Sequence, residues 1–306
     1  MVRRVEVTGA GGVRLAAWDF TDEERAEPSG GAAVVEGVGA GARGEARPTV
    51  LFLHGLMGRA AHWAASARAL APRYRTAALD QRGHGRSEKP DTAAYDREAY
   101  VRDVEAAIEQ LDLAPVVLVG HSMGALTAWQ VAARRPDLVR ALVVCDMRAS
   151  AVGESSQRDW EQWFKSWPLP FATLADVRGW FAEQDPTLEE PRPERGAFFA
   201  EVMEERDGGW WPQFSFDHML SSRDAWVNDA HWDELAQVRC PALVVRGVDG
   251  ELGRAEAQEM VRVLPRGAYA EIPDAGHLVP WDRPAEWQQV LTAFLDDHSP
   301  HKPIGR

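Results

Sequence analysis

Four short apolar runs, separated by segments of helical periodicity, constrain the fold of this chain more than any other feature. They are TVLFL at 49–53, YRTAAL at 74–79, PVVLV at 115–119 and LVRALVV at 138–144. Uninterrupted apolar strands are typical of a parallel sheet that is covered by helices on both faces. Between two of these runs, residues 98–111 place apolar side chains on one face of a predicted helix. The pattern predicts an α/β core.

A long segment interrupts this alternation, which stops near Asp146 and resumes at Pro241. The intervening residues hold eight of the thirteen tryptophans. Aromatic side chains recur there at helical spacing, at Trp160, Trp163, Phe164 and Trp167. We therefore expect a helical cap at 147–232, inserted into a core that comprises residues 1–146 and 233–298.

The tryptophans of this predicted cap have two interpretations. Packing within the cap's own core is the simpler one for any single tryptophan. The alternative is that some of them line the substrate pocket, and the candidates for substrate binding are Trp160, Trp163 and Trp211.

The peripheral segments lead to three further expectations. Apolar residues at 4–7 and 13–20, on either side of TGAGG, predict an N-terminal hairpin. Residues 21–47 are rich in Gly, Ala and Glu and predict a flexible surface loop. The polar tail at 299–306 is expected to be disordered.

Composition and charge argue against several classes of function. The net charge of -13, without a dense basic run, makes nucleic acid an unexpected partner. Two isolated cysteines, Cys145 and Cys240, are typical of a reducing compartment and predict neither a disulfide framework nor a metal site. No window reaches the roughly 18 apolar residues of a membrane-spanning helix, and the N-terminus lacks a signal-type apolar core. We expect a soluble, cytoplasmic monomer or homodimer without a membrane partner.

A serine lies where one predicted strand turns into a helix. The run PVVLV leads directly into GHSMG at 120–124, and a helical segment follows. A serine on such a sharp turn presents its hydroxyl above the edge of the sheet, and small neighbours let the strand and the helix approach each other. Ser122 is therefore the candidate nucleophile, with Gly120 and Gly124 as the small neighbours.

Two further motifs complement Ser122. HGLMG follows the first apolar run, and the backbone N–H of its Leu56 can join that of Met123 in an oxyanion hole. DAGH follows a later strand and places His277 after the serine in chain order, as the general base of this arrangement requires.

These motifs resemble those of the α/β-hydrolase fold family, specifically its capped branch of esterases, lactonases, carbon–carbon bond hydrolases and cofactor-free perhydrolases. The resemblance spans nearly the whole chain and rests on HGLMG, DQRGHGRS at 80–87, GHSMG and DAGH, in the family's order. It implies a mostly parallel eight-stranded sheet flanked by helices, an inserted cap, and hydrolysis without a metal or cofactor. His84 and Arg82 of DQRGHGRS are expected to hold loops together rather than to contact substrate.

The catalytic acid departs from the family pattern. The family usually places this acid three residues after the glycine that ends the seventh strand, and counting from Gly247 leads to Gly250. Glu251 and Asp249 flank that position, whereas Asp146 ends the sixth strand, a location that some relatives of this fold use. Glu251 ranks first because its longer side chain recovers the distance, Asp249 ranks second and Asp146 third.

Two classes of function follow from these residues. In the first, Ser122 attacks an acyl carbonyl, His277 transfers the proton to the leaving group, and an acyl-enzyme forms. A serine at this turn also excludes haloalkane dehalogenase and epoxide hydrolase chemistry, which requires an aspartate there. The second class is a non-catalytic ligand receptor built on the same fold, which would need neither a nucleophile nor a base. We expect the enzyme.

The predicted cap bears on the substrate. Residues 147–232 carry sixteen acidic and eight basic side chains, a net charge of -8. That field disfavours polyanions, and aromatic walls favour apolar ligands. We expect a small-molecule substrate, a neutral and largely apolar ester or lactone. Carbon–carbon bond hydrolysis and perhydrolysis are alternatives, because they use the same catalytic groups.

Overall fold

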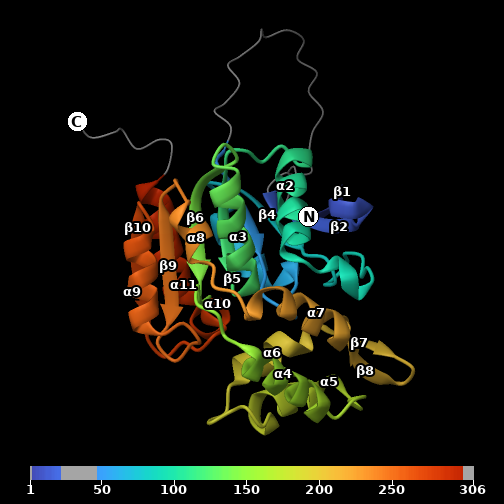
Figure 1. The fold of residues 1–306 in the computed structure, drawn as a ribbon. Helices are drawn as coiled ribbons and strands as arrows, with labels where there is room; N and C mark the ends of the chain where they lie inside the picture. Colours follow the sequence, from blue (N-terminus) through green and yellow to red (C-terminus); the bar gives the residue numbers. More distant parts are fainter. Residues whose placement is uncertain (1, 22–46, 299–306) are drawn as a thin grey trace, which may run out of the picture.

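The computed structural model of the chain describes residues 2–21 and 47–298. Its main feature is an eight-stranded sheet with the strand order β1-β2-β4-β3-β5-β6-β9-β10 (Figure 1). The strands are β1 Arg3–Thr8, β2 Arg14–Asp19, β3 Thr49–Leu53, β4 Arg75–Asp80, β5 Val116–His121, β6 Val139–Cys145, β9 Ala242–Gly247 and β10 Gly267–Ile272. β2 pairs antiparallel with β1 and β4, and all other neighbours are parallel. The predicted α/β sheet and N-terminal hairpin are confirmed.

Helices cover both faces of the sheet, as the apolar strands require. One buried cluster joins the sheet to α2 Arg97–Gln110, α3 Met123–Arg134, α8 Trp232–Ala236 and α9 Arg254–Val263. A second cluster joins the opposite face to α1 Ala64–Leu70 and α11 Pro284–Asp297. Each cluster contains a fully buried tryptophan, Trp129 on α3 and Trp287 on α11. None of the described helices is long and apolar enough to cross a membrane.

Residues 147–232, which we call the insert, gather at one end of the sheet (Figure 1). The insert comprises α4 Glu154–Ser166, α5 Leu174–Gly179, the short π-helix Trp180–Gln184, α6 Pro193–Ala200, β7 Met203–Arg206, β8 Gly209–Pro212 and α7 Phe216–Val227. Its aromatic side chains form a third cluster, which also contains Leu56 from the loop after β3 and Met123, the first residue of α3. The insert therefore packs on the carboxyl ends of the parallel strands.

The sequence predicted a helical segment at 147–232, but the insert also contains two strands. β7 and β8 form an antiparallel hairpin whose turn is Asp207-Gly208. Both turn residues have positive φ, 54° and 75°. An Asp-Gly pair is among the strongest signals for such a tight hairpin turn. The expected flexible loop at 21–47 and disordered tail at 299–306 fall, apart from residues 21 and 47, outside the described residues.

Candidate active site

Ser122 lies on the turn between β5 and α3, with φ 51° and ψ -126°. Such backbone geometry costs about 1–3 kcal/mol for a residue other than glycine and persists only where the surroundings hold it. The surroundings are tight because Cβ atoms at Gly120 and Gly124 would lie 2.4 Å from backbone oxygens, those of Gly124 and Leu53 respectively. The glycines thus allow β5, α3 and β3 to meet, and the serine stands at the first turn of the helix.

His277 lies in the DAGH loop after β10, and two contacts fix it. Its Nδ1 donates to Oδ2 of Asp146 at 2.8 Å. Its backbone carbonyl accepts a hydrogen bond of 2.7 Å from Nε2 of His121, the neighbour of Ser122. Burial lowers the pKa of His121 well below its usual value, so this imidazole is neutral. The serine turn and the histidine loop are therefore held together directly.

Asp146 is the carboxylate that contacts His277. It follows β6, is fully buried and has φ 46°. Besides the imidazole, its carboxylate accepts backbone N–H groups of Glu251 at 2.9 Å and of Gly247 at 3.3 Å. These donors stabilise a buried charge that would otherwise be costly. The geometry supports Asp146 as the partner that fixes the histidine tautomer.

The geometry reverses the ranking made from the sequence. The closest approach of Glu251 to His277 Nδ1 is 3.9 Å, and the Glu251 side chain is 63% exposed. No hydrogen bond or ion pair joins the Asp249 side chain to His277 within the part of the chain that the structure describes, although both residues line a cavity that does not contain Ser122. The loop after β9 presents its backbone N–H groups, rather than its carboxylates, to the imidazole's partner.

The charges around His277 change its basicity. Burial alone would lower the pKa of His277, but the charge of Glu251, the hydrogen bond to Asp146 and the charge of Asp146 raise the pKa to about 9. Arg195 opposes this rise. Glu251 therefore affects the base by its field although it makes no hydrogen bond to it.

The loop that carries Leu56 approaches the serine closely. A Cβ at Gly55 would lie 2.9 Å from Cβ of Ser122. The next N–H group, that of Met57, donates to Nε2 of His84 at 3.1 Å. Burial lowers the pKa of His84 to about 3, so this ring nitrogen remains an acceptor. Leu56 lines the same cavity as Ser122.

The N–H groups of Leu56 and Met123 have no recorded acceptor among the described residues. Met123 opens α3, and the first N–H groups of a helix lack an intrahelical acceptor. The oxyanion hole formed by these two N–H groups stays a prediction from the sequence. As expected, His84 and also Arg82, which is paired with Asp103, hold neighbouring loops.

A cavity of about 250 Å³ contains Ser122 and His277. Its other lining residues come from the core loops and the insert: Leu56, Met147, Arg148, Val152, Ser156, Trp160, Arg223, Trp226 and Glu251. No hydrogen bond between the Ser122 hydroxyl and His277 is recorded among the described side chains. Such catalytic contacts are often loose before substrate binds.

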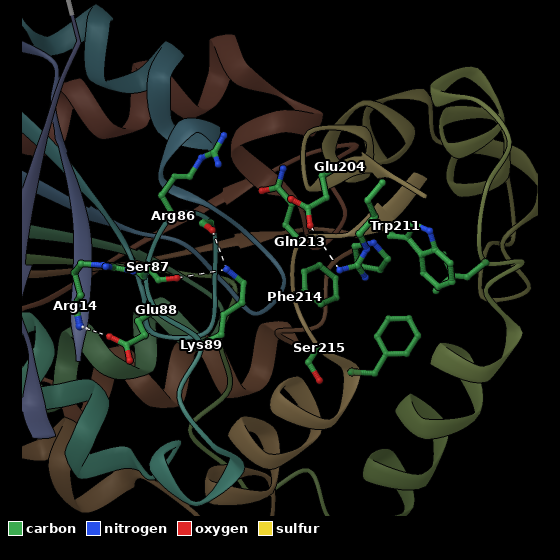
Figure 2. Close-up of a pocket in the computed structure, with 15 residues that line it drawn as sticks. Arg14, Arg86, Ser87, Glu88, Lys89, Glu204, Trp211, Gln213, Phe214 and Ser215 are labelled. Carbon is green, nitrogen blue, oxygen red and sulfur yellow. Dashed lines mark hydrogen bonds and ion pairs between the residues drawn. The ribbon is translucent and has the colours of Figure 1, made fainter. Parts of the chain in front are cut away.

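Only one of the three candidate tryptophans lines this cavity, namely Trp160. Trp163 is buried inside the insert, where its Nε1 donates to the carboxylate of Asp185. Trp211 lines a separate cavity of about 800 Å³, which Figure 2 shows between the loop after β4 and the residues around β8. That cavity contains neither Ser122 nor His277. Helical spacing identified aromatic residues of the insert, but not which of them face the serine.

Two residues of α7, Arg223 and Trp226, were not among the site residues predicted from the sequence. Both line the cavity, and Arg223 is 3% exposed. In the sequence, SSRDAW has the composition of an ordinary polar helix, so no local signal distinguishes this arginine from a solvated one. Among the described residues, no group of three or more His, Cys, Asp or Glu side chains could hold a metal ion.

Comparisons with known proteins identify the family and the fold of the chain. The family model of the alpha/beta hydrolase fold matches residues 48–178. The 2-(acetamidomethylene)succinate hydrolase of Mesorhizobium japonicum is 30% identical over 257 residues, which cover 81% of this chain and 88% of the relative. The sn-1-specific diacylglycerol lipase ABHD11 of Mus musculus is 30% identical over 256 residues, which cover 81% of each chain. The crystal structure of E-2-(acetamidomethylene)succinate hydrolase superposes with a TM-score of 0.77 at 25% identity, over 97% of this chain and 100% of that chain.

Proposed function

Because this chain belongs to the α/β-hydrolase fold family, we propose that it is a serine hydrolase that cleaves a carboxylic ester or lactone through an acyl-enzyme on Ser122. Its relatives are hydrolases, which confirms the expectation of an enzyme over that of a non-catalytic receptor. Their names specify different substrates, so no single substrate is carried over to this chain.

One observation carries the proposal: the strained Ser122 borders the same cavity as His277, whose imidazole is hydrogen-bonded to Asp146. In the proposed reaction, Ser122 Oγ attacks the acyl carbon while His277 Nε2 takes the hydroxyl proton. Asp146 keeps the Nδ1–H tautomer and stabilises the imidazolium.

The tetrahedral oxyanion is held by the N–H groups of Leu56 and Met123. Its collapse breaks the bond to the alkoxide, which receives the proton from His277. A water molecule, activated by the same imidazole, then releases the acid and regenerates Ser122. For a lactone, the leaving oxygen stays tethered to the acyl group through the carbon chain, and hydrolysis of the acyl-enzyme releases a single hydroxy acid. We further propose that the insert acts as a cap that excludes bulk water from this sequence.

The test is a panel of activated esters, lactones, β-diketones and peroxide donors, assayed with the wild type and with Ser122→Ala. Ester or lactone turnover that Ser122→Ala abolishes, with an unchanged circular-dichroism spectrum, is the expected result. Undiminished turnover in Ser122→Ala would overturn the mechanism. Turnover of only the β-diketones or the peroxide donors would favour the carbon–carbon hydrolase or the perhydrolase alternative.

A further inference from the structure

Three arginines in the described residues are buried, and one of them differs from the other two. Arg82 is paired with the carboxylate of Asp103 at 2.7 Å, and Arg246 approaches Glu271 at 3.3 Å. Arg223 is similarly buried, but its side-chain hydrogen bonds among the described residues go to neutral groups and no ion pair within 4.0 Å joins it to a carboxylate. Burying a cation without a counter-charge is strongly unfavourable, so its presence calls for a physical explanation.

The surroundings of Arg223 leave part of its hydrogen-bonding capacity unused. One terminal nitrogen donates to Oε1 of Gln157 at 2.9 Å and the other to Oγ of Ser156 at 2.5 Å. Both acceptors are neutral, and Nε has no partner. The guanidinium also lies over the rings of Trp160 and Trp226, 5.0 Å and 5.5 Å from their centroids. Neutral acceptors and rings hold this side chain in place, but they do not neutralise it.

Arg223 keeps its charge despite these surroundings. Burial lowers its pKa to about 10, while the more distant carboxylates of Glu251 and Asp159 raise it. A guanidinium with that pKa is protonated at neutral pH. The other arginine of the cavity, Arg148, already donates to Glu256 at 2.9 Å. Arg223 is therefore the one cation of this cavity, among the described residues, without a carboxylate partner.

We infer that Arg223 binds a carboxylate of the substrate, so that the preferred ester or lactone is a small one that carries a second, free carboxylate. The inference rests on the proposed serine hydrolysis for the identity of the reacting group. A guanidinium recognises a carboxylate through paired N–H groups, and desolvation by the indole rings strengthens that contact. A cavity of about 250 Å³ has room for a short acyl chain between its serine and its arginine.

This inference differs from the expectation of a neutral substrate. That expectation used the net charge of the whole insert, most of which lies on exposed side chains that water and salt screen. Inside the cavity, the local charge near Trp160 and Trp226 is positive. One unpaired cation matches one carboxylate better than a doubly charged phosphate. Glu251 lines the same cavity, 3.9 Å from Nδ1 of His277, and opposes a second anionic group beside the imidazole.

The experiment compares two esters that differ in one charge, 4-nitrophenyl hydrogen glutarate and its methyl ester. The readout is the ratio of kcat/KM for the acid to kcat/KM for the methyl ester. Arg223→Gln should lower this ratio at least tenfold. Arg223→Lys, which keeps the charge but loses the planar pair of donors, should lower it less. The control Arg158→Gln removes an exposed arginine of α4 and should leave the ratio unchanged. An unchanged ratio in Arg223→Gln overturns the inference.

A binding measurement separates this inference from the proposed hydrolysis. In a Ser122→Ala background, calorimetry should show that Arg223→Gln weakens binding of the glutarate half-ester at least tenfold. Arg223-dependent binding without any turnover by the wild type would overturn serine hydrolysis and retain the carboxylate site. Turnover of both esters by the wild type, with binding that does not depend on Arg223, would retain serine hydrolysis and overturn the carboxylate site.

The wild type alone provides a further check if the Arg223 variants fail to fold. Monomethyl glutarate should inhibit turnover of the methyl ester at least tenfold more strongly than the corresponding amide or inorganic phosphate does. Equal inhibition by the amide would show that the charge is not recognised. Stronger inhibition by phosphate would overturn the choice of a carboxylate.

Discussion

A methyl group at Gly250 would lie 2.6 Å from both carboxylate oxygens of Asp146, so these two positions compete for the same space. Gly250 is where the family resemblance places the catalytic acid, and Asp146 is where the structure places a carboxylate against His277. The two positions are thus alternative places in the chain from which one carboxylate can reach His277. A glycine in the loop after β9 leaves room for an acid that comes from β6.

Removing the charge of Asp146 should abolish most activity. Asp146→Asn preserves shape but offers His277 a neutral amide, which neither fixes the Nδ1–H tautomer nor stabilises the imidazolium. Turnover of an activated ester should fall by about 10⁴. Asp249→Asn, the matched carboxamide change in the neighbouring loop, serves as the control and should stay within a few-fold of the wild type. The reverse pattern, with Asp249→Asn the more damaging, would assign the acid to Asp249.

Moving the acid should restore part of that loss. Asp146→Gly empties the space beside Gly250 and suits the positive φ of 46° at this position. Adding Gly250→Asp then supplies a carboxylate from the usual family position. Stopped-flow or steady-state assays should show the double variant at least tenfold more active than Asp146→Gly alone. Gly250→Asp in the otherwise wild-type chain should be poorly folded, because two carboxylates would occupy one site. A double variant no faster than Asp146→Gly would contradict the shared-space interpretation.

The fold was predictable because its signals are local. Apolar runs define buried strands, and the sharp turn at Ser122 requires small residues at Gly120 and Gly124 so that the neighbouring strand and helix can meet. The N-terminal hairpin and the chain order of Ser122 and His277 follow from the same short patterns. Each of these motifs consists of residues that are neighbours in the sequence.

The site was predictable only in part because its remaining contacts join distant segments. The hydrogen bond from His277 to Asp146 spans 131 positions in the chain. Counting residues from Gly247 gave no sign of it, since the approach depends on how two loops pack. The environment of Arg223 is equally nonlocal, because its acceptors lie on α4 whereas the arginine itself is on α7. Charge counts over the insert could not reveal one buried cation.

The tight packing at Gly124 should make even a methyl group destabilising. A Cβ there would lie 2.4 Å from the carbonyl oxygen of Leu53 and 2.5 Å from that of His54. Both contacts are with backbone, which cannot move aside without shifting β3, and overpacking of this kind typically costs about 1–3 kcal/mol. Gly179→Ala is the control, since a Cβ there meets no atom within 4 Å and its φ of -61° is helical. Thermal or urea unfolding should show Gly124→Ala destabilised and Gly179→Ala equal to or more stable than the wild type.

His84 should act as a positioning residue for the oxyanion loop. Its Nε2 accepts the N–H of Met57, next to Leu56. His84→Ala should lower kcat by about tenfold to a hundredfold, because a misplaced donor fails mainly in the transition state, with a smaller change in KM. His62→Ala removes another buried histidine, one that contacts Phe198 of the insert, and should reduce stability without a comparable loss of kcat. Partial rescue by His84→Gln, which retains an acceptor, would support a positioning role. Equal kcat losses in the His62 and His84 variants would contradict it.

Glu251 should control the pH at which the enzyme becomes active. The pKa of His277 is raised to about 9 against the effect of burial, and the charge of Glu251 is the largest of the influences that raise it. The base must be unprotonated to accept the proton of Ser122, so kcat/KM for a neutral ester should rise with pH, with its midpoint near that pKa and a plateau above it. Glu251→Gln removes a charge that stabilises the imidazolium. The midpoint should therefore move to lower pH, and activity at pH 7 should increase relative to the plateau.

Added salt should shift the wild-type midpoint in the same direction, because the Glu251 side chain is largely exposed and its field is screened. Glu154→Gln, at an exposed position of α4, is the matched control and should leave the profile unchanged. A midpoint that stays in place or rises in Glu251→Gln would show that the base is governed by Asp146 alone.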